Sequence, residues 1–119
     1  MKSFNRSDRI SQQIKRELSE MIQQGEIKDD RISGMVSITQ VIVSHDLRMV
    51  KVYFSVFGDE SQRVGTLAAL EDASGYLRGE LCRRLKMRFA PDMNFYLDDS
   101  LEKGQKVVEL LDKIKNQQQ

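Results

Sequence analysis

Hydrophobic residues recur along the chain with two different periods, and this pattern divides the chain into helices and strands. Residues 8–24 place apolar side chains at steps of three and four, the spacing of one buried helix face: Ile10, Ile14, Leu18, Met21 and Ile22. Ser7 or Asp8 can cap the start of this helix, and Gly25 suits its end. Residues 26–34 then form a loop.

Three segments alternate apolar and polar residues, as strands do. The first runs from Val36 to Val43, and its alternation changes phase at Thr39-Gln40, which indicates a β-bulge. The second covers residues 50–56 and follows a short connection, so the two strands are predicted to form a hairpin. The third covers residues 93–97, after the breaker Ala90-Pro91-Asp92.

The segment from Ser61 to Met87 carries an apolar stripe that is interrupted once. Its members recur at helical spacing: Leu67, Leu70, Leu77, Leu81 and Leu85. Ser74 stands where the stripe needs its next member, between Ala73 and Gly75. A glycine inside a helix costs about 1 kcal/mol relative to alanine, and small residues favour a kink or the close approach of another backbone. We therefore predict two helices joined by a kink.

A last helix is predicted from Asp99-Ser100, with a narrow apolar face: Val107, Leu110, Leu111 and Ile114. The order is then helix, strand, strand, kinked helix, strand, helix. In this α+β arrangement, a three-stranded sheet with helices on one face buries every apolar stripe. Residues 1–115 are expected to form a single domain, and residues 116–119 a short polar tail.

Composition limits the class of protein. Of the 119 residues, 39% are hydrophobic and 31% charged, as in a folded, soluble domain. The apolar runs are too short for a transmembrane helix, and the first residues lack the apolar core of a signal peptide. The single cysteine, Cys82, excludes an intramolecular disulfide and fits a reducing compartment. We expect a cytoplasmic protein.

Charge is segregated along the kinked helix. Residues 59–72 are mainly acidic, whereas residues 76–91 hold five cations against Glu80: Arg78, Arg83, Arg84, Lys86 and Arg88. Because the net charge is only +1, binding to a polyanion has to rest on such local segregation. These cations either contact RNA phosphates or form a solvated helix face whose charges suit the helix dipole. The five-to-one excess beside the kink favours RNA.

Catalytic patterns are missing from the sequence. His45 is the only histidine, so neither a histidine metal site nor a histidine dyad can form. We find no glycine-rich phosphate loop, activated nucleophile or paired-carboxylate motif. We expect a protein that is not an enzyme and that needs no metal or cofactor.

The predicted order, with a glycine-containing break between two helices before the last strand, resembles that of type II KH domains. In KH domains a GxxG loop at this point clamps the backbone of single-stranded nucleic acid. Here Ala73-Ser74-Gly75 takes the place of that loop. This departure is similar to the ribosome-binding factor A family, in which a helix–kink–helix with an Ala-x-Gly interruption replaces the loop.

The resemblance extends roughly from Arg6 to Leu111. It is carried by segments that follow one another as they do in the family: Lys28-Asp29-Asp30-Arg31, Ser44-His45-Asp46-Leu47, Val50-Lys51-Val52-Tyr53, Ala73-Ser74-Gly75-Tyr76-Leu77-Arg78 and Leu85-Lys86-Met87-Arg88, followed by Pro91, Phe95, Asp98 and Ser100. One departure is Asp30, where the family usually has proline.

The resemblance implies a KH-like fold and a role in maturation of the small ribosomal subunit. It implies binding to 16S rRNA and to free or immature 30S subunits, help with late rRNA processing, release by a ribosome-assembly GTPase, and importance in the cold. A monomer that does not bind membranes is expected. The expected RNA contacts are the five cations of residues 76–91, Ser74 and Gly75 at the kink, and Arg6 with Arg9 near the first helix.

Two alternatives remain open at this point. One is a divergent KH module that binds RNA outside ribosome assembly, and the other is a small adaptor that docks a protein on its helix stripe. The side chains of Tyr53 and Tyr96 are expected on the sheet face opposite the core, where they either stack on bases or reflect the preference of strands for aromatics.

Overall fold

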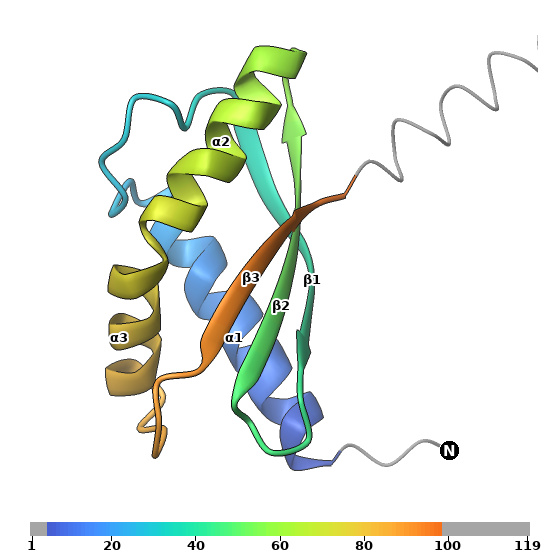
Figure 1. Cartoon of the computed structure of the whole chain (residues 1–119), viewed down its shortest axis with the longest axis vertical. Coiled ribbons are helices and arrows are strands. Elements are labelled where there is room, and N and C mark those ends of the chain that lie inside the picture. The colour runs from blue at the N-terminus through green and yellow to red at the C-terminus, as the bar shows by residue number, and fades with distance from the viewer. Residues whose placement is uncertain (1–4, 99–119) are drawn as a thin grey trace, which may run out of the picture.

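The structure, a computed structural model, describes residues 5–98 (Figure 1). The predicted helix after Asp98 and the polar tail lie outside the described residues. The order of elements is the predicted one: α1 (Arg6–Gln23), β1 (Met35–Val43), β2 (Met49–Phe57), α2 (Glu60–Asp72), α3 (Ser74–Arg84) and β3 (Asp92–Leu97).

The three described strands form one sheet in the order β1-β2-β3. β1 and β2 pair antiparallel, as a hairpin must, whereas β3 lies parallel to β2 because α2 and α3 cross over between them. The predicted bulge is confirmed. Ile38 lies opposite Phe54 and Gln40 opposite Tyr53, so Thr39 is the extra residue. The Thr39 hydroxyl donates a hydrogen bond to Asp98, 2.7 Å away, just beyond the end of β3.

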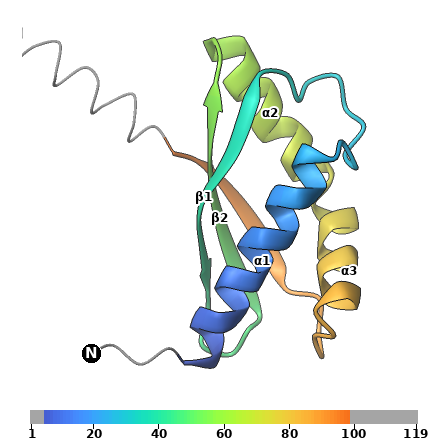
Figure 2. The same cartoon turned by 180° about the vertical axis from the view of Figure 1, so that it is seen from behind.

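The helices cover one face of the sheet, and the core lies between them. Figure 1 shows the strands in front of α1, and Figure 2 shows α1 in front of the strands from behind. The core joins buried side chains of α1, α2 and α3 to those of all three strands, among them Ile14, Leu18, Val52, Phe54, Leu70, Leu77, Leu81 and Phe95. The predicted alternation therefore places the apolar side of each strand against the helices.

The start of α1 differs from the sequence prediction. The cap is Asn5, not Ser7 or Asp8. The Asn5 side chain accepts a hydrogen bond from the Asp8 backbone N–H, and the Asp8 carboxylate accepts one from the Asn5 N–H. Asp8 therefore belongs to a capping box as its third helical residue, which places the cap three residues earlier. Gly25 does end α1, with φ of 70°.

The kink is where the sequence places it, as expected for a type II KH-like domain. Ala73 separates α2 from α3 with φ of −86° and ψ of 0°, and its N–H still bonds to the Ala69 carbonyl. Of the leucine stripe, Leu70, Leu77 and Leu81 are fully buried. α3, the second half of the kinked helix, ends at Arg84 and not at the predicted Met87, because the backbone turns left-handed at Lys86.

The loop after α1 is tied to the end of α2 by the ion pair between Arg31 and Asp72. The Arg31 guanidinium lies 2.6 Å from the Asp29 carboxylate and 2.8 Å from that of Asp72. Asp29 also accepts a hydrogen bond from the Arg31 backbone N–H. These bonds, first from the Arg31 side chain and then from its backbone, lower the pKa of Asp29 from 3.8 to about 2. The loop is therefore anchored although Asp30 stands in place of a proline.

The outer face of the sheet carries the two tyrosines. Tyr53 and Tyr96 are register partners on β2 and β3, and their rings stack with centroids 5.2 Å apart. Tyr96 is exposed and Tyr53 half-buried, so both are on the side away from the helices, as predicted. Among the described residues, no helix combines the length and apolar character needed to cross a membrane.

Candidate nucleic-acid interface

Three segments that are far apart in the sequence meet at one end of the molecule. They are the first turn of α1, the turn between β1 and β2, and the segment that follows α3, all at the lower end of Figures 1 and 2. They enclose a pocket of about 300 Å³, which we call the basic pocket. Its lining is Arg6, Ile10, Asp46, Leu47, Arg48, Leu85, Lys86, Met87, Arg88 and Phe89.

Cations dominate the rim of the basic pocket. Arg6, Lys86 and Arg88 are predicted contacts that the fold brings together, and Arg48 joins them. Within residues 5–98, none of these four side chains forms an ion pair. All four are exposed. Four cations and one carboxylate, Asp46, line this concavity. Its net charge is therefore positive and attracts phosphate groups, because a cleft with an excess of one charge concentrates the field.

Lys86 reaches the rim through an unusual helix end. The Met87 N–H bonds to the Cys82 carbonyl, which is the six-to-one bond of a Schellman motif, and Lys86 occupies its left-handed position with φ of 52°. In α1 the Glu26 N–H bonds to the Met21 carbonyl in the same way, but the left-handed residue there is Gly25. The same motif thus ends with the usual glycine in α1 and with lysine in α3, beside the basic pocket.

The turn between β1 and β2 is also held in a left-handed conformation, at Leu47 with φ of 63°. The Asp46 carboxylate accepts hydrogen bonds from the Ser44 hydroxyl and the Arg48 backbone N–H. These two bonds, in that order of weight, lower the pKa of Asp46 from its ordinary value. Asp46, the one carboxylate of the basic pocket, is therefore hydrogen-bonded within its own turn, and its bond to the Arg48 N–H orients the backbone at Arg48.

Phe89 lies beside two of the cations. The guanidinium carbons of Arg48 and Arg88 are 5.6 and 5.5 Å from the centroid of its ring. Both distances are within the range of cation–π contacts. The ring is 55% exposed. A large aromatic that stays this exposed, next to unpaired cations, is typical of surfaces that stack on nucleic-acid bases.

Arg78 holds the segment that carries Arg88 and Phe89. Its Nε donates to the Pro91 carbonyl at 2.7 Å, and its Nη2 lies 3.1 Å from the Asp92 carboxylate. These contacts fasten residues 90–92 to the middle of α3, so Arg78 positions one wall of the basic pocket. Its guanidinium is not part of the lining.

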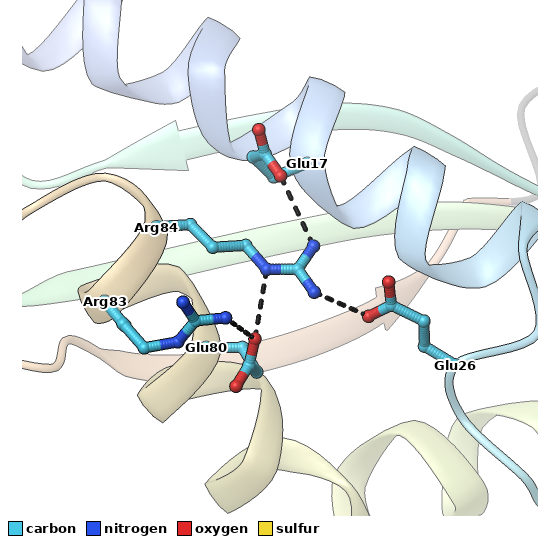
Figure 3. A network of polar contacts seen from close by, with 5 residues as sticks. All are labelled: Glu17, Glu26, Glu80, Arg83 and Arg84. Atoms are coloured by element: carbon cyan, nitrogen blue, oxygen red, sulfur yellow. Dashed lines mark hydrogen bonds and ion pairs between the residues drawn. The ribbon is translucent and has the colours of Figure 1, made fainter.

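Arg83 and Arg84 point elsewhere, into a network of carboxylates (Figure 3). Arg84 binds Glu80 through Nε at 3.0 Å, Glu26 through Nη2 at 2.8 Å and Glu17 through Nη1 at 3.5 Å. Arg83 contacts Glu80 at 2.7 Å. The hydrogen bond from Arg83, with that from Arg84, lowers the pKa of Glu80. Arg84 thereby joins α1, the loop after it and α3, and the charges of both arginines face protein carboxylates.

The remaining predicted residues lie apart from the basic pocket. Arg9 is exposed one turn along α1 from Arg6. Ser74 and Gly75 begin α3, whose far end carries Lys86, and 11 helical residues span roughly 16 Å. Gly75 has no positive φ, and a Cβ added there would meet no atom within 4 Å. The kink thus leaves room for a ligand, but at a separate place.

Sequence reasoning missed Arg48, Phe89 and the strain at Leu47. Two signals were available: an arginine directly after a hairpin turn, and an aromatic directly after Arg88. No group of three or more potential metal ligands gathers anywhere in residues 5–98.

Comparison with known proteins gives a single family. The family model of ribosome-binding factor A matches residues 6–111. Ribosome-binding factor A of Caldanaerobacter subterraneus subsp. tengcongensis is 47% identical over 95% of this chain and 92% of its own length.

Solved structures agree with the family model. The crystal structure of ribosome-binding factor A from Thermus thermophilus has a TM-score of 0.66 and 32% identity, over 78% of this chain and 97% of its own. A homology model of the Thermus thermophilus protein, fitted into a cryo-EM map of its complex with the 30S subunit, has a TM-score of 0.62 and 32% identity, over 75% of this chain and 91% of its own. The chain shown in Figures 1 to 3 is therefore a member of the ribosome-binding factor A family.

Proposed function

We propose that this protein binds the small ribosomal subunit during its maturation and contacts 16S rRNA through the basic pocket. The observation that carries the proposal is the convergence of Arg6, Arg48, Lys86 and Arg88, from three separate segments, without an ion pair among residues 5–98. A relative supports the proposal: a homology model of the Thermus thermophilus protein was fitted into a cryo-EM map of its complex with the 30S subunit.

The role is that of a binding factor rather than an enzyme. By attaching to an immature particle, it holds an rRNA folding intermediate while the ends of the 16S precursor are processed, and it leaves when maturation is complete. Release is the task of an assembly GTPase, and the protein acts as a monomer in the cytoplasm. Misfolded RNA helices rearrange more slowly in the cold, so the factor matters most at low temperature.

Charge reversal tests the interface. The variant Arg48→Glu, Lys86→Glu, Arg88→Glu should lose cosedimentation with small subunits, and the salt dependence of its residual binding should flatten, because each phosphate contact contributes a slope of about 0.7 to 0.9. The matched control is Lys15→Glu, Arg16→Glu, Lys51→Glu, three exposed cations away from the basic pocket. It has the same net charge and should bind almost normally. Equal loss in both variants would mean that only net charge matters.

Removal of the gene tests the role in maturation. Cells without the protein should accumulate small subunits that carry unprocessed 16S precursor and should grow slowly in the cold. Normal 16S ends in such cells at low temperature, in the absence of a paralogue, would refute the role in processing while leaving subunit binding intact.

A further inference from the structure

The basic pocket combines two kinds of surface, and this combination restricts its ligand. Its floor is apolar: Ile10, Leu47 and Leu85 are partly buried and pack against the core. Its rim is cationic. A phosphate group alone needs only the rim, because an apolar floor gives an anion no favourable contact. A ligand that fits both surfaces has an anionic group attached to a flat apolar part, which is the chemistry of a nucleotide.

Phe89 offers the base a stacking partner. Its ring is 55% exposed and forms the edge of the basic pocket. The guanidinium groups of Arg48 and Arg88 lie over the ring, and both groups are carried by flexible side chains. A base that stacks on the ring displaces one guanidinium, which is then free to pair with the phosphate of the same nucleotide. Every base has a π-face, so this contact tolerates any sequence.

The size of the basic pocket selects unpaired RNA. About 300 Å³ is the lower end of the range for pockets that hold small ligands, so it admits one base and not a stacked series. A base inside a duplex is covered on both faces by its neighbours, whereas bases in loops, bulges and ends can turn out and stack on aromatic side chains.

Backbone strain is concentrated at the same place. Leu47 and Lys86 are the two non-glycine residues with positive φ in the described part of the chain, and both line the basic pocket. Such conformations are uncommon for bulky residues and cluster at ligand sites. Each belongs to a hydrogen-bonded turn, the hairpin turn at Leu47 and the helix end at Lys86, so two fixed turns meet at the basic pocket.

We propose that the basic pocket binds one unpaired nucleotide of RNA, with its base against Phe89 and the apolar floor and its phosphate at the cationic rim. The inference rests on the proposed function, because it describes how the same pocket recognises rRNA. It adds that recognition depends on an aromatic ring and on single-stranded RNA, neither of which charge alone requires.

The test compares two substitutions of phenylalanine by leucine. Phe89→Leu keeps an apolar side chain but removes the ring, and it should weaken binding to small subunits about 5- to 150-fold, the loss caused by removing one base–aromatic stack. Phe57→Leu is the matched control: Phe57 is 85% exposed at the far end of β2. It should bind as the unchanged protein does. Thermal melting of both variants checks that the fold is intact.

A second measurement uses short oligo(A) and oligo(U) and their duplex as ligands. The unchanged protein should prefer the single strands, and Phe89→Leu should lose this preference while the salt dependence stays. Equal affinity of Phe89→Leu and Phe57→Leu for subunits, or a preference for the duplex, would overturn the nucleotide pocket. If the charge-reversal variant still loses subunit binding, the proposed function survives that result; if it binds normally, the proposed function fails as well.

Discussion

Lys86 stands in a backbone position that suits glycine, so replacing it should separate stability from binding. The left-handed conformation costs an L-residue roughly 1 to 2 kcal/mol, and glycine avoids this cost. Glycine also gives the unfolded chain more freedom, which offsets about 0.5 to 1 kcal/mol. Lys86→Gly should therefore raise the free energy of unfolding by up to about 1.5 kcal/mol. The side chain is exposed, so its packing contributes little.

The same variant should bind small subunits less well. Removing one cation from the rim removes one phosphate contact, which should lower the slope of log affinity against log salt by about 0.7 to 0.9. Denaturation in urea and cosedimentation at several salt concentrations measure the two effects on one protein. A variant that is both less stable and unchanged in binding would refute the reasoning, because Lys86 would then contribute to the fold and not to the interface.

Gly25 supplies the reciprocal control. It occupies the equivalent position at the end of α1, with φ of 70°, and a Cβ added there would meet no atom within 4 Å. Gly25→Lys creates no clash and should therefore lower the free energy of unfolding by up to about 1.5 kcal/mol, because the left-handed strain exceeds the effect of a less flexible unfolded chain. It also lies outside the lining of the basic pocket, so binding should not change. If Gly25→Lys stabilises the protein, the strain of the left-handed conformation is smaller than the unfolded-chain effect, and the expected gain from Lys86→Gly fails as well.

Other parts of the structure give further expectations. Arg84→Met leaves Glu17, Glu26 and Glu80 without their shared cation, whereas Arg83→Met removes one exposed contact. Arg84→Met should therefore lower the melting temperature more than Arg83→Met does. Equal melting temperatures would contradict this expectation. The folded pKa of Asp29 is lowered from 3.8 to about 2. The stabilising effect of its carboxylate is therefore complete above about pH 4 and is lost as the pH falls from 3.8 to about 2. Asp29→Asn should lose less stability than the unchanged protein when both are titrated with acid through that window. Gly75→Leu adds a good helix former in open space, so the free energy of unfolding should be unchanged or up to about 0.8 kcal/mol higher. Loss of subunit binding in this folded variant would place RNA at the kink. Normal binding would limit the interface to the basic pocket.

The hydrophobic pattern was sufficient for the fold because each element has one buried face. The leucine stripe and its interruption at Ser74 predicted both helices and their junction, and the phase change at Thr39 predicted the bulge. The start of α1 was misplaced because Asn5, Ser7 and Asp8 are all good caps, and only the reciprocal bonds between Asn5 and Asp8 select one. Local patterns do not rank such neighbours.

The candidate site was harder to predict because charge in a sequence does not show what each cation faces. Arg83, Arg84 and Lys86 are neighbours in the chain, yet Arg84 turns toward Glu17 and Glu26, which are 67 and 58 residues away, while Lys86 lines the basic pocket. Arg48 joins Lys86 only because the turn before β2 and the segment after α3 line the same pocket. These pairings depend on tertiary contacts, which no local pattern contains.

The assembly of the basic pocket from residues 6–10, 46–48 and 85–89 has a consequence for synthesis of the protein. During translation the first two walls leave the ribosome long before the third, so a growing chain lacks a complete basic pocket until residue 89 has emerged and α3 has docked. An unfolded chain lacks it as well. Ligand that binds only the folded state stabilises that state by mass action, about 2.7 kcal/mol at a concentration one hundred times the dissociation constant. On the proposed function, attachment to the subunit would protect the factor from unfolding, and a misfolded copy would not compete for the particle.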